Sequence, residues 1–323
     1  MANQAASETA AACPAVQTAA GGVEYSALMS ASWSGSTLLS MLLCSQPRVA
    51  GFGDTYFTIH NNPRDECTCG VRFLDCALRK AIEDYARTNE MPSFAWPQLR
   101  PVPMPRFLPP HVAMAWPLRR NATVAIWRAI PVGLRRILFH RWYQETGLML
   151  GALELTGEYD VYFDGCKNLV RIELLRTEYP RLRLIHSVRH PGAFLYHYAR
   201  YGHGDLERRL AGWLQYQRRA REFLRLVGPD AYMLVKYEDV VSQPAQFLRN
   251  IGTFLGLSSV DDSEPVRVDS NRVHILGNRM RETITEVVNM AERWRGRLDP
   301  NWERAARDVL GQDEWLTRLY PDG

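Results

Sequence analysis

The sequence predicts an α/β protein of three layers, with a central parallel sheet between helices. Short apolar segments that end in small or polar residues recur along the chain, as is typical of buried parallel strands. Helical patterns follow several of them, and strands that alternate with helices pair in parallel through crossover connections. The first strand and helix are joined by a turn of small residues, which predicts a P-loop-like strand, loop and helix.

Five segments are predicted as strands because each is short, apolar and bounded by polar or small residues. They are Tyr25–Ser30, Arg48–Phe52, Asp160–Phe163, Leu182–Val188 and Tyr232–Val235. Helical patterns follow the first, third and fourth of these strands, at Thr37–Cys44, Leu169–Tyr179 and Ala193–Tyr201.

Length and composition predict one enzyme-sized unit. With 323 residues, 46% of them hydrophobic, the chain can bury a large core. We predict a disordered leader over residues 1–22 and a single domain over residues 23–323. The net charge of +4 suits small anionic ligands and is too low for a nucleic-acid-binding surface. No apolar run has the length of a membrane span and the leader lacks a signal-peptide pattern, so we expect a cytosolic protein.

Residues 91–147 interrupt the strand pattern and are predicted as a mostly helical insertion. Proline, tryptophan and arginine are spread there among apolar residues. Such a segment could pack on the sheet, cover an amphiphilic substrate or touch a membrane surface, and the sequence leaves the three alternatives open. The oligomeric state is not indicated.

Three of the six cysteines form a Cys-x-Cys-x6-Cys cluster, Cys67, Cys69 and Cys76. Six cysteines are too few for a disulfide scaffold in a chain of this length. The cluster could hold zinc with a fourth ligand such as His60, although this spacing differs from paired Cys-x2-Cys motifs. A loop of reduced thiols is the alternative.

The turn Ser32-Trp-Ser-Gly-Ser-Thr37 joins the first predicted strand to the first helix. Its backbone N–H groups and the hydroxyls of Ser36 and Thr37 could hold phosphate oxygens, because a helix amino-terminus favours negative charge. The turn lacks the Gly-x4-Gly-Lys-Ser/Thr pattern of nucleoside triphosphatases, which argues against a kinase. An ordinary capped turn is the alternative interpretation.

The segment Ser34-Gly-Ser-Thr-Leu-Leu39 resembles the 5′-phosphosulfate loop of sulfotransferases, which use 3′-phosphoadenosine 5′-phosphosulfate (PAPS) as donor. Three later segments resemble the family in the same order and spacing. Leu184–Pro191 resembles a strand and turn ending in Arg-Asp-Pro, Lys236–Gly256 contains Tyr-Glu-Asp and Phe-Leu-Gly, and His274–Arg281 is similar to a Gly-Asn-x-x-Arg segment of bacterial members. Outside the insertion, the resemblance covers about Tyr25–Arg281.

The resemblance implies which residues bind the donor. Arg189 takes the role of the arginine that binds the nucleotide 3′-phosphate, and Arg279 and Arg281 approach the same group. A guanidinium binds phosphate oxygens bidentately, which a lysine cannot do. His197 stands where the family commonly has a serine that bonds the 3′-phosphate. The residues implied at the 5′ end are Trp33, Ser34, Gly35, Ser36, Thr37 and Leu38.

Sulfuryl transfer requires in-line positioning, charge neutralisation and a base, but no metal. Asp54 follows the second strand, where related enzymes often place a catalytic carboxylate, and His60 is the second candidate base. Lys167 matches a lysine that some members direct at the bridging oxygen of the sulfate. Trp33 departs from the family, which has Lys or Arg there, and an indole cannot neutralise charge.

These residues predict a PAPS-dependent sulfotransferase that acts on a hydroxyl or amine of a small-molecule or amphiphilic acceptor. One alternative is a P-loop-type kinase of nucleotides or small molecules, which shares the strand, loop and helix. The other is a catalytically silent module that binds PAPS or the product 3′-phosphoadenosine 5′-phosphate (PAP), as the missing loop cation would allow.

Overall fold

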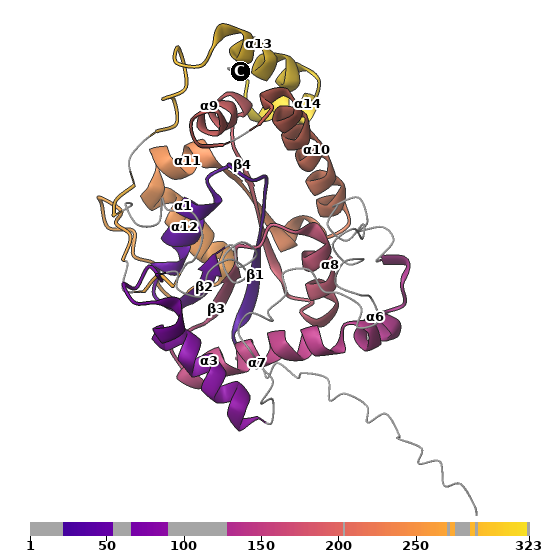
Figure 1. Ribbon diagram of the computed structural model, residues 1–323, viewed down its shortest axis with the longest axis vertical. Coiled ribbons are helices and arrows are strands. Elements are labelled where there is room, and N and C mark those ends of the chain that lie inside the picture. The colour runs from indigo at the N-terminus through magenta and orange to yellow at the C-terminus, as the bar shows by residue number, and fades with distance from the viewer. Residues whose placement is uncertain are drawn as a thin grey trace, which may run out of the picture.

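The computed structural model describes residues 22–53, 66–89, 128–202, 204–269, 272–274, 285–287 and 290–321. Its centre is a parallel sheet of five strands in the order β2-β3-β1-β4-β5 (Figure 1). The strands are β1 (Glu24–Ser30), β2 (Val49–Gly53), β3 (Val161–Asp164), β4 (Arg183–Val188) and β5 (Tyr232–Lys236). Each lies within one residue of its predicted bounds at both ends, and the predicted α/β fold class is confirmed.

Alternation of side chains along β1 divides the core into two layers. Tyr25, Ala27 and Met29 belong to one apolar cluster and Leu28 to the other, as the period of two in a strand requires. The first cluster includes residues of α3 (Ala77–Thr88), α7 (His140–Thr156), α8 (Leu169–Glu178) and α10 (Leu206–Arg225). The second includes residues of α1 (Ser36–Cys44), α11 (Tyr237–Ser242) and α12 (Pro244–Leu255).

A third apolar cluster lies beyond the carboxyl ends of β1 and β4, where it includes Ala31 and Val188. It joins α9 (Pro191–Tyr201) to α10 and to the last two helices, α13 (Pro300–Gly311) and α14 (Glu314–Leu319). Figure 1 shows these helices together at one end of the molecule. The C-terminal part of the chain therefore packs beside the edge of the sheet where ligands gather in open α/β folds.

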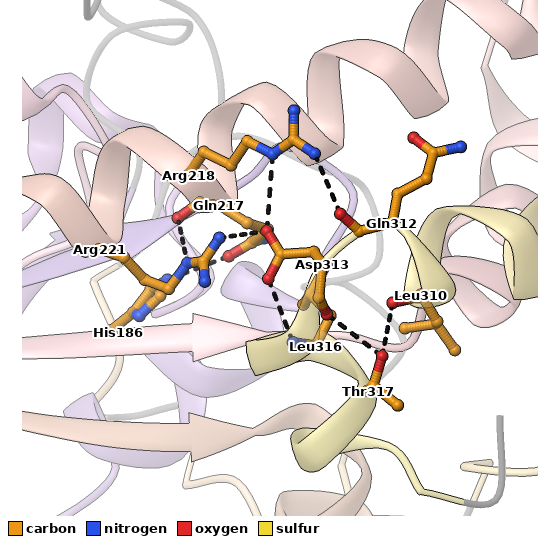
Figure 2. Close-up of polar contacts among 9 residues, drawn as sticks. All are labelled: His186, Gln217, Arg218, Arg221, Leu310, Gln312, Asp313, Leu316 and Thr317. Atoms are coloured by element: carbon orange, nitrogen blue, oxygen red, sulfur yellow. Dashed lines mark hydrogen bonds and ion pairs between the residues drawn. The ribbon is translucent and has the colours of Figure 1, made fainter.

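Asp313 connects this C-terminal part to α10 (Figure 2). Its carboxylate accepts a hydrogen bond from the N–H of Leu316 at 3.3 Å and so caps α14. The same carboxylate pairs with the guanidinium groups of Arg221 and Arg218 on α10, the latter at 3.5 Å. The Asp313 side chain thus caps α14 and also attaches this helix to α10.

Residues 1–21 and 90–127 lie outside the described chain, so the leader stays a prediction and so does most of the insertion. The rest of the predicted insertion begins with α6 (Val132–Leu138), which is followed by α7. In the described ranges, no helix combines the length and the apolar character that crossing a membrane demands.

Candidate functional site

The loop between β1 and α1 is shaped by two residues with left-handed backbone. Trp33 has φ 69° and Gly35 has φ 83°. A Cβ atom at Gly35 would come within 2.2 Å of the Tyr237 ring, so only glycine fits. Helix α1 starts at Ser36 with no acidic residue in its first turn. The first turn of α1 therefore places no carboxylate of its own at the positive end of the helix, which suits a bound anion.

Ser34 and Arg189 each have a buried polar atom that lacks a hydrogen-bond partner in the described chain. These atoms are Ser34 Oγ and Arg189 Nε, and the two residues are 0% and 7% exposed. An unpaired buried polar group costs free energy unless a ligand or water completes it. Both residues belong to the predicted donor site, and the Ser34 hydroxyl and Arg189 Nε could each donate a hydrogen bond to a phosphate oxygen.

Arg189 follows β4 and bridges the ends of three neighbouring strands. Its Nη1 donates a hydrogen bond to the carbonyl oxygen of Trp33 at 3.2 Å, and its Cζ lies 4.3 Å from the ring centroid of Tyr237, which follows β5. Burial lowers the pKa of Arg189 from its ordinary value. The guanidinium is held between the loop and α11 in a fixed orientation.

Glu238 stabilises the turn after β4 through its carboxylate. Its carboxylate accepts hydrogen bonds from the His190 N–H at 2.9 Å and from the Tyr320 hydroxyl at 3.0 Å, and burial raises its pKa. His190 accepts the Gly192 N–H on Nδ1 at 3.0 Å and so caps α9. Burial, with smaller contributions from nearby cations, lowers the pKa of His190 to about 3, so the ring is neutral at pH 7.

Lys167 reaches the loop from β3. Its Nζ lies 3.2 Å from Ser36 Oγ. The turn that carries Lys167 is fixed by the buried carboxylate of Asp164, which accepts from the Cys166 N–H at 2.9 Å, from Arg171 Nε at 2.7 Å and from the Tyr25 hydroxyl at 2.6 Å. This places the ammonium group beside the start of α1, where the resemblance predicts the sulfate end of the donor.

His197 lies on α9 beside the Trp33 indole. The centroid of the Trp33 ring is 5.7 Å from that of His197 and 5.5 Å from that of Tyr198. Burial, followed by the charges of Arg189 and Arg200, lowers the pKa of His197 to about 4. The indole therefore packs on α9, and the imidazole beside it is neutral at pH 7.

A cavity of about 530 Å³ adjoins the loop. Trp33, Phe194 and Trp213 contribute aromatic surface to it, and Arg208 and Arg209 contribute charge. Tyr216 also lines it and donates a hydrogen bond to the Lys167 carbonyl at 3.4 Å. The cavity is thus linked both to the loop and to the turn that carries Lys167.

Four predicted site residues, Asp54, His60, Arg279 and Arg281, lie outside the described residues. Those that the structure does bring together are the loop Trp33–Leu38, Lys167, Arg189 and His197. Glu238 belongs to the Tyr-Glu-Asp segment that resembles the family, but the sequence did not predict its supporting role. Trp294 and Tyr320 were not predicted as site residues. Trp294 stacks on His190 at 4.6 Å between ring centroids, a contact without a local sequence signal.

The three clustered cysteines also come together, with a partner that the sequence did not indicate. His274 lies against them among the described residues, whereas His60, the fourth ligand suggested from the sequence, lies outside the described ranges. The cluster contains no residue of the loop and does not contain Arg189.

The sequence profile of the sulfotransferase family matches residues 28–262. This chain belongs to the sulfotransferase family. The match contains the loop, Lys167, Arg189 and Glu238, whereas Trp294 and Tyr320 lie beyond it. A comparison with curated proteins found no match.

Several solved sulfotransferases have a similar fold at low sequence identity. The sulfotransferase domain of the curacin biosynthetic pathway has 15% identity and a TM-score of 0.48 over 90% of this chain and 97% of its own. The sulfotransferase domain of the Synechococcus PCC 7002 olefin synthase has 19% identity and a TM-score of 0.47 over 88% and 93%. The mouse sulfotransferase SULT7A1 complexed with PAP has 11% identity and a TM-score of 0.41 over 91% and 85%.

Proposed function

We propose that this sulfotransferase transfers the sulfuryl group of PAPS to a hydroxyl or amine of a small-molecule or amphiphilic acceptor. The observation that carries the proposal is the pair of buried atoms without a hydrogen-bond partner in the described chain, Ser34 Oγ and Arg189 Nε, beside the start of α1, whose first turn has no acidic residue. A donor with phosphates at two positions would satisfy both. Family membership supports the reaction class.

The donor would be held by groups at the ends of neighbouring strands. The backbone of Ser34–Leu38 and the hydroxyls of Ser34, Ser36 and Thr37 would bind the 5′-phosphosulfate. Arg189, with Arg279 and Arg281 from the later segment, would bind the 3′-phosphate. His197 would donate or accept a hydrogen bond there as a neutral imidazole, since its pKa is lowered to about 4.

Transfer would then depend on one base and one cation. Asp54, or His60 in its place, removes the proton from the acceptor hydroxyl or amine while that atom attacks sulfur in line. Lys167 neutralises charge on the oxygen that bridges sulfur and the 5′-phosphate as that bond breaks. The products are the sulfated acceptor and PAP, and the proton stays on the base.

The cavity beside Trp33 is the proposed acceptor site. Its aromatic side chains suit an apolar acceptor body, and Arg208, Arg209 and Asp205 offer polar contacts at one part of its lining. Tyr216 links this cavity to the Lys167 turn, so an acceptor there would lie near the proposed sulfate position. We place the enzyme in the cytosol, in keeping with its composition.

The Trp33 position favours one other candidate, a silent module that binds PAPS or PAP without turnover. The indole packs against Tyr198 and His197 and supplies no charge where the family has a cation. In the active enzyme, Lys167 would supply the positive charge at the loop, and its 3.2 Å approach to Ser36 supports that role.

Calorimetric titration with PAP and with ATP tests the nucleotide assignment. We expect PAP to bind more tightly, and equal or stronger binding of ATP would favour a kinase. Incubation with PAPS and fractionated metabolites, read by mass spectrometry, then tests turnover. A mass gain of one sulfuryl group that requires PAPS identifies the acceptor, whereas PAP binding without such a gain across all fractions favours the silent module.

A further inference from the structure

Four potential metal ligands, none of them a loop residue or Arg189, come together from two segments that are distant in the sequence. Cys67, Cys69 and Cys76 come from the segment that leads into α3, and His274 follows Cys76 by 198 positions in the sequence. Their ligand atoms all lie within 4.8 Å of one another. Cys67 and Cys76 are buried, whereas Cys69 and His274 are half-buried, so an ion could enter from one side.

The distances agree with the edges of a tetrahedral zinc site. Bonds of about 2.3 Å to sulfur and about 2.0 Å to nitrogen give edges of about 3.8 Å between two sulfurs and about 3.5 Å between sulfur and nitrogen. The Sγ atoms of Cys67 and Cys76 are 3.9 Å apart. Nδ1 of His274 is 3.8 Å from Cys67 Sγ and 3.2 Å from Cys76 Sγ. The distance between the Cys67 and Cys76 sulfurs is far longer than a disulfide bond of about 2.05 Å, so the two cysteines are not bonded to each other.

The backbone around the cysteines is already ordered for binding. The Gly70 N–H bonds to the Cys67 carbonyl at 2.9 Å, and the Cys67 N–H bonds to the Val71 carbonyl at 2.8 Å. Gly70 has φ 83°, which permits this tight turn. Cys76 occupies the N-cap position of α3, and its N–H bonds to Phe73. Two of the three sulfurs are thus carried by a tight turn and the third by a helix start.

The histidine segment is attached to that turn independently of the ligands. The Thr68 hydroxyl donates a hydrogen bond to the carbonyl of Val273, whose side chain is fully buried. Because Val273 directly precedes His274, this contact fixes where the imidazole meets the cysteines. The approach of the two segments therefore does not depend on the cysteine and histidine side chains alone.

We propose that Cys67, Cys69, Cys76 and His274 bind one zinc ion. Three thiolates and one imidazole are a ligand set that zinc prefers, and hard cations such as Mg²⁺ prefer oxygen. Four protein ligands leave no position for water or substrate, so the ion is structural rather than catalytic. It joins the segment before α3 to residues 272–274, and binding to the folded chain alone would stabilise the fold.

The site would also anchor two stretches of chain that carry predicted functional residues. Asp54 and His60 precede Cys67, and Arg279 and Arg281 follow His274 by five and seven positions. This consequence rests on the proposed function, whereas the zinc site does not. Metal content is therefore measured separately from nucleotide binding and turnover.

Elemental analysis of the full chain, purified without a polyhistidine tag, tests the proposal. We expect one zinc per chain in the unmodified protein and in the Cys44→Ala control, which removes a buried thiol outside the cluster. Cys69→Ser and His274→Gln should each weaken zinc binding by about 10-fold or more in competition with a chromogenic chelator. Retention of zinc with unchanged affinity in both variants would overturn the assignment.

A second measurement covers the case in which a variant does not fold. Unmodified protein is first freed of metal by a chelator and then titrated with Co²⁺. The absorption spectrum of bound Co²⁺ reports the geometry of its ligands. We expect the visible bands of tetrahedral cobalt and a thiolate charge-transfer band, both lost on addition of one equivalent of Zn²⁺. A chain isolated without zinc that takes up neither ion, or that contains a Cys67–Cys76 disulfide in its place, would overturn the proposal.

Discussion

The guanidinium of Arg189 donates a hydrogen bond to the carbonyl oxygen of Trp33 across 3.2 Å, while Nε of the same group has no partner in the described chain. The side chain is oriented by the loop and by the Tyr237 ring before any ligand arrives. Little conformational freedom would then be lost on binding an anion, which is the advantage of a preorganised site.

Arg189→Ala should therefore weaken PAP binding by about 10- to 100-fold, because a hydrogen bond to a charged group contributes about 1.5–3 kcal/mol. Isothermal titration calorimetry measures this change. Arg200→Ala is the matched control, since Arg200 is exposed on α9, the helix that follows Arg189 in the sequence, and it should bind PAP as the unmodified protein does. An Arg189→Ala protein with unchanged PAP affinity would remove Arg189 from the nucleotide site.

Lys167→Met should lower kcat by about 100-fold or more, since loss of one group that stabilises transition-state charge costs about this much. PAP affinity should change little, because the proposed role of Lys167 is at the sulfate. Single-turnover assays with labelled PAPS separate the two quantities. Lys80→Met, at an exposed position of α3, serves as the control. A large loss of PAP affinity with normal turnover would contradict the role.

Asp54→Asn should lower turnover by about 100-fold or more while PAP affinity stays nearly intact, because a general base contributes about that factor to rate. The same assays on His60→Gln distinguish the two candidate bases. Normal turnover in the Asp54→Asn protein, together with a large loss in the His60→Gln protein, would transfer the role to His60.

Two buried histidines, His186 and His190, and the half-buried His197 should make the fold less stable as the pH falls. Burial lowers the pKa of His186 and His197 to about 4 and that of His190 to about 3, against about 6.5 in the unfolded chain. Above pH 6.5 the three imidazoles are neutral in both the folded and the unfolded chain, so their burial carries no protonation penalty there. The stability of the fold decreases as the pH falls below 6.5, because only the unfolded state then takes up these protons.

The replacement His190→Asn, which keeps a capping acceptor for α9, isolates one of these groups. Between pH 6 and pH 4.5, the dependence of the unfolding free energy on pH should become shallower by about 1.4 kcal/mol per pH unit. Urea unfolding at several pH values measures the slope. The difference between the two proteins should be constant above pH 7, and parallel slopes below pH 6 would show that His190 titrates normally.

Asp313→Asn should destabilise the fold by about 1–3 kcal/mol at pH 7. Burial acts to raise the pKa of Asp313, but hydrogen bonds and charge from Arg221, with smaller contributions from Leu316 and Arg218, lower it overall. The carboxylate therefore stabilises the fold above its unfolded pKa of about 3.9, and this stabilisation is lost as the pH falls through the lower folded value.

Thermal unfolding of the two proteins from pH 7 to pH 2.5 measures this difference, which should shrink below pH 4. The control Asp262→Asn removes an exposed partner of Arg249 and should cost about 0–1 kcal/mol. Equal effects of the two replacements would show that the Asp313 network in Figure 2 contributes no more than a surface ion pair.

The sequence predicted elements well and contacts between distant elements poorly. The five strands were recognised because each is an apolar run with polar ends, a local pattern that burial in a parallel sheet imposes. Lys167 and Arg189 were assigned to the site by the resemblance to the family, and both follow such runs. Because the carboxyl ends of parallel strands lie at one edge of the sheet, Lys167 and Arg189 were expected to lie near the loop after β1.

Contacts such as Tyr320 with Glu238, or His274 with the cysteines, had no comparable signal. Tyr320 is 82 positions from Glu238, and His274 is 198 or more positions from the cysteines. No local sequence pattern around Tyr320 or His274 indicates which residue it contacts. The indole of Trp33 was recognised as a departure from the family, but its packing on α9 depends on side-chain directions that spacing does not encode.

The strand order has a consequence for synthesis on the ribosome. β1 pairs only with β3 and β4 among the described strands, and Glu24 lies opposite Val161, 137 positions later. At about 5–20 residues per second, the nascent chain waits on the order of ten seconds before either neighbour of β1 has been translated. During that interval the apolar side chains of β1 remain without their sheet, which makes this strand a natural binding segment for chaperones.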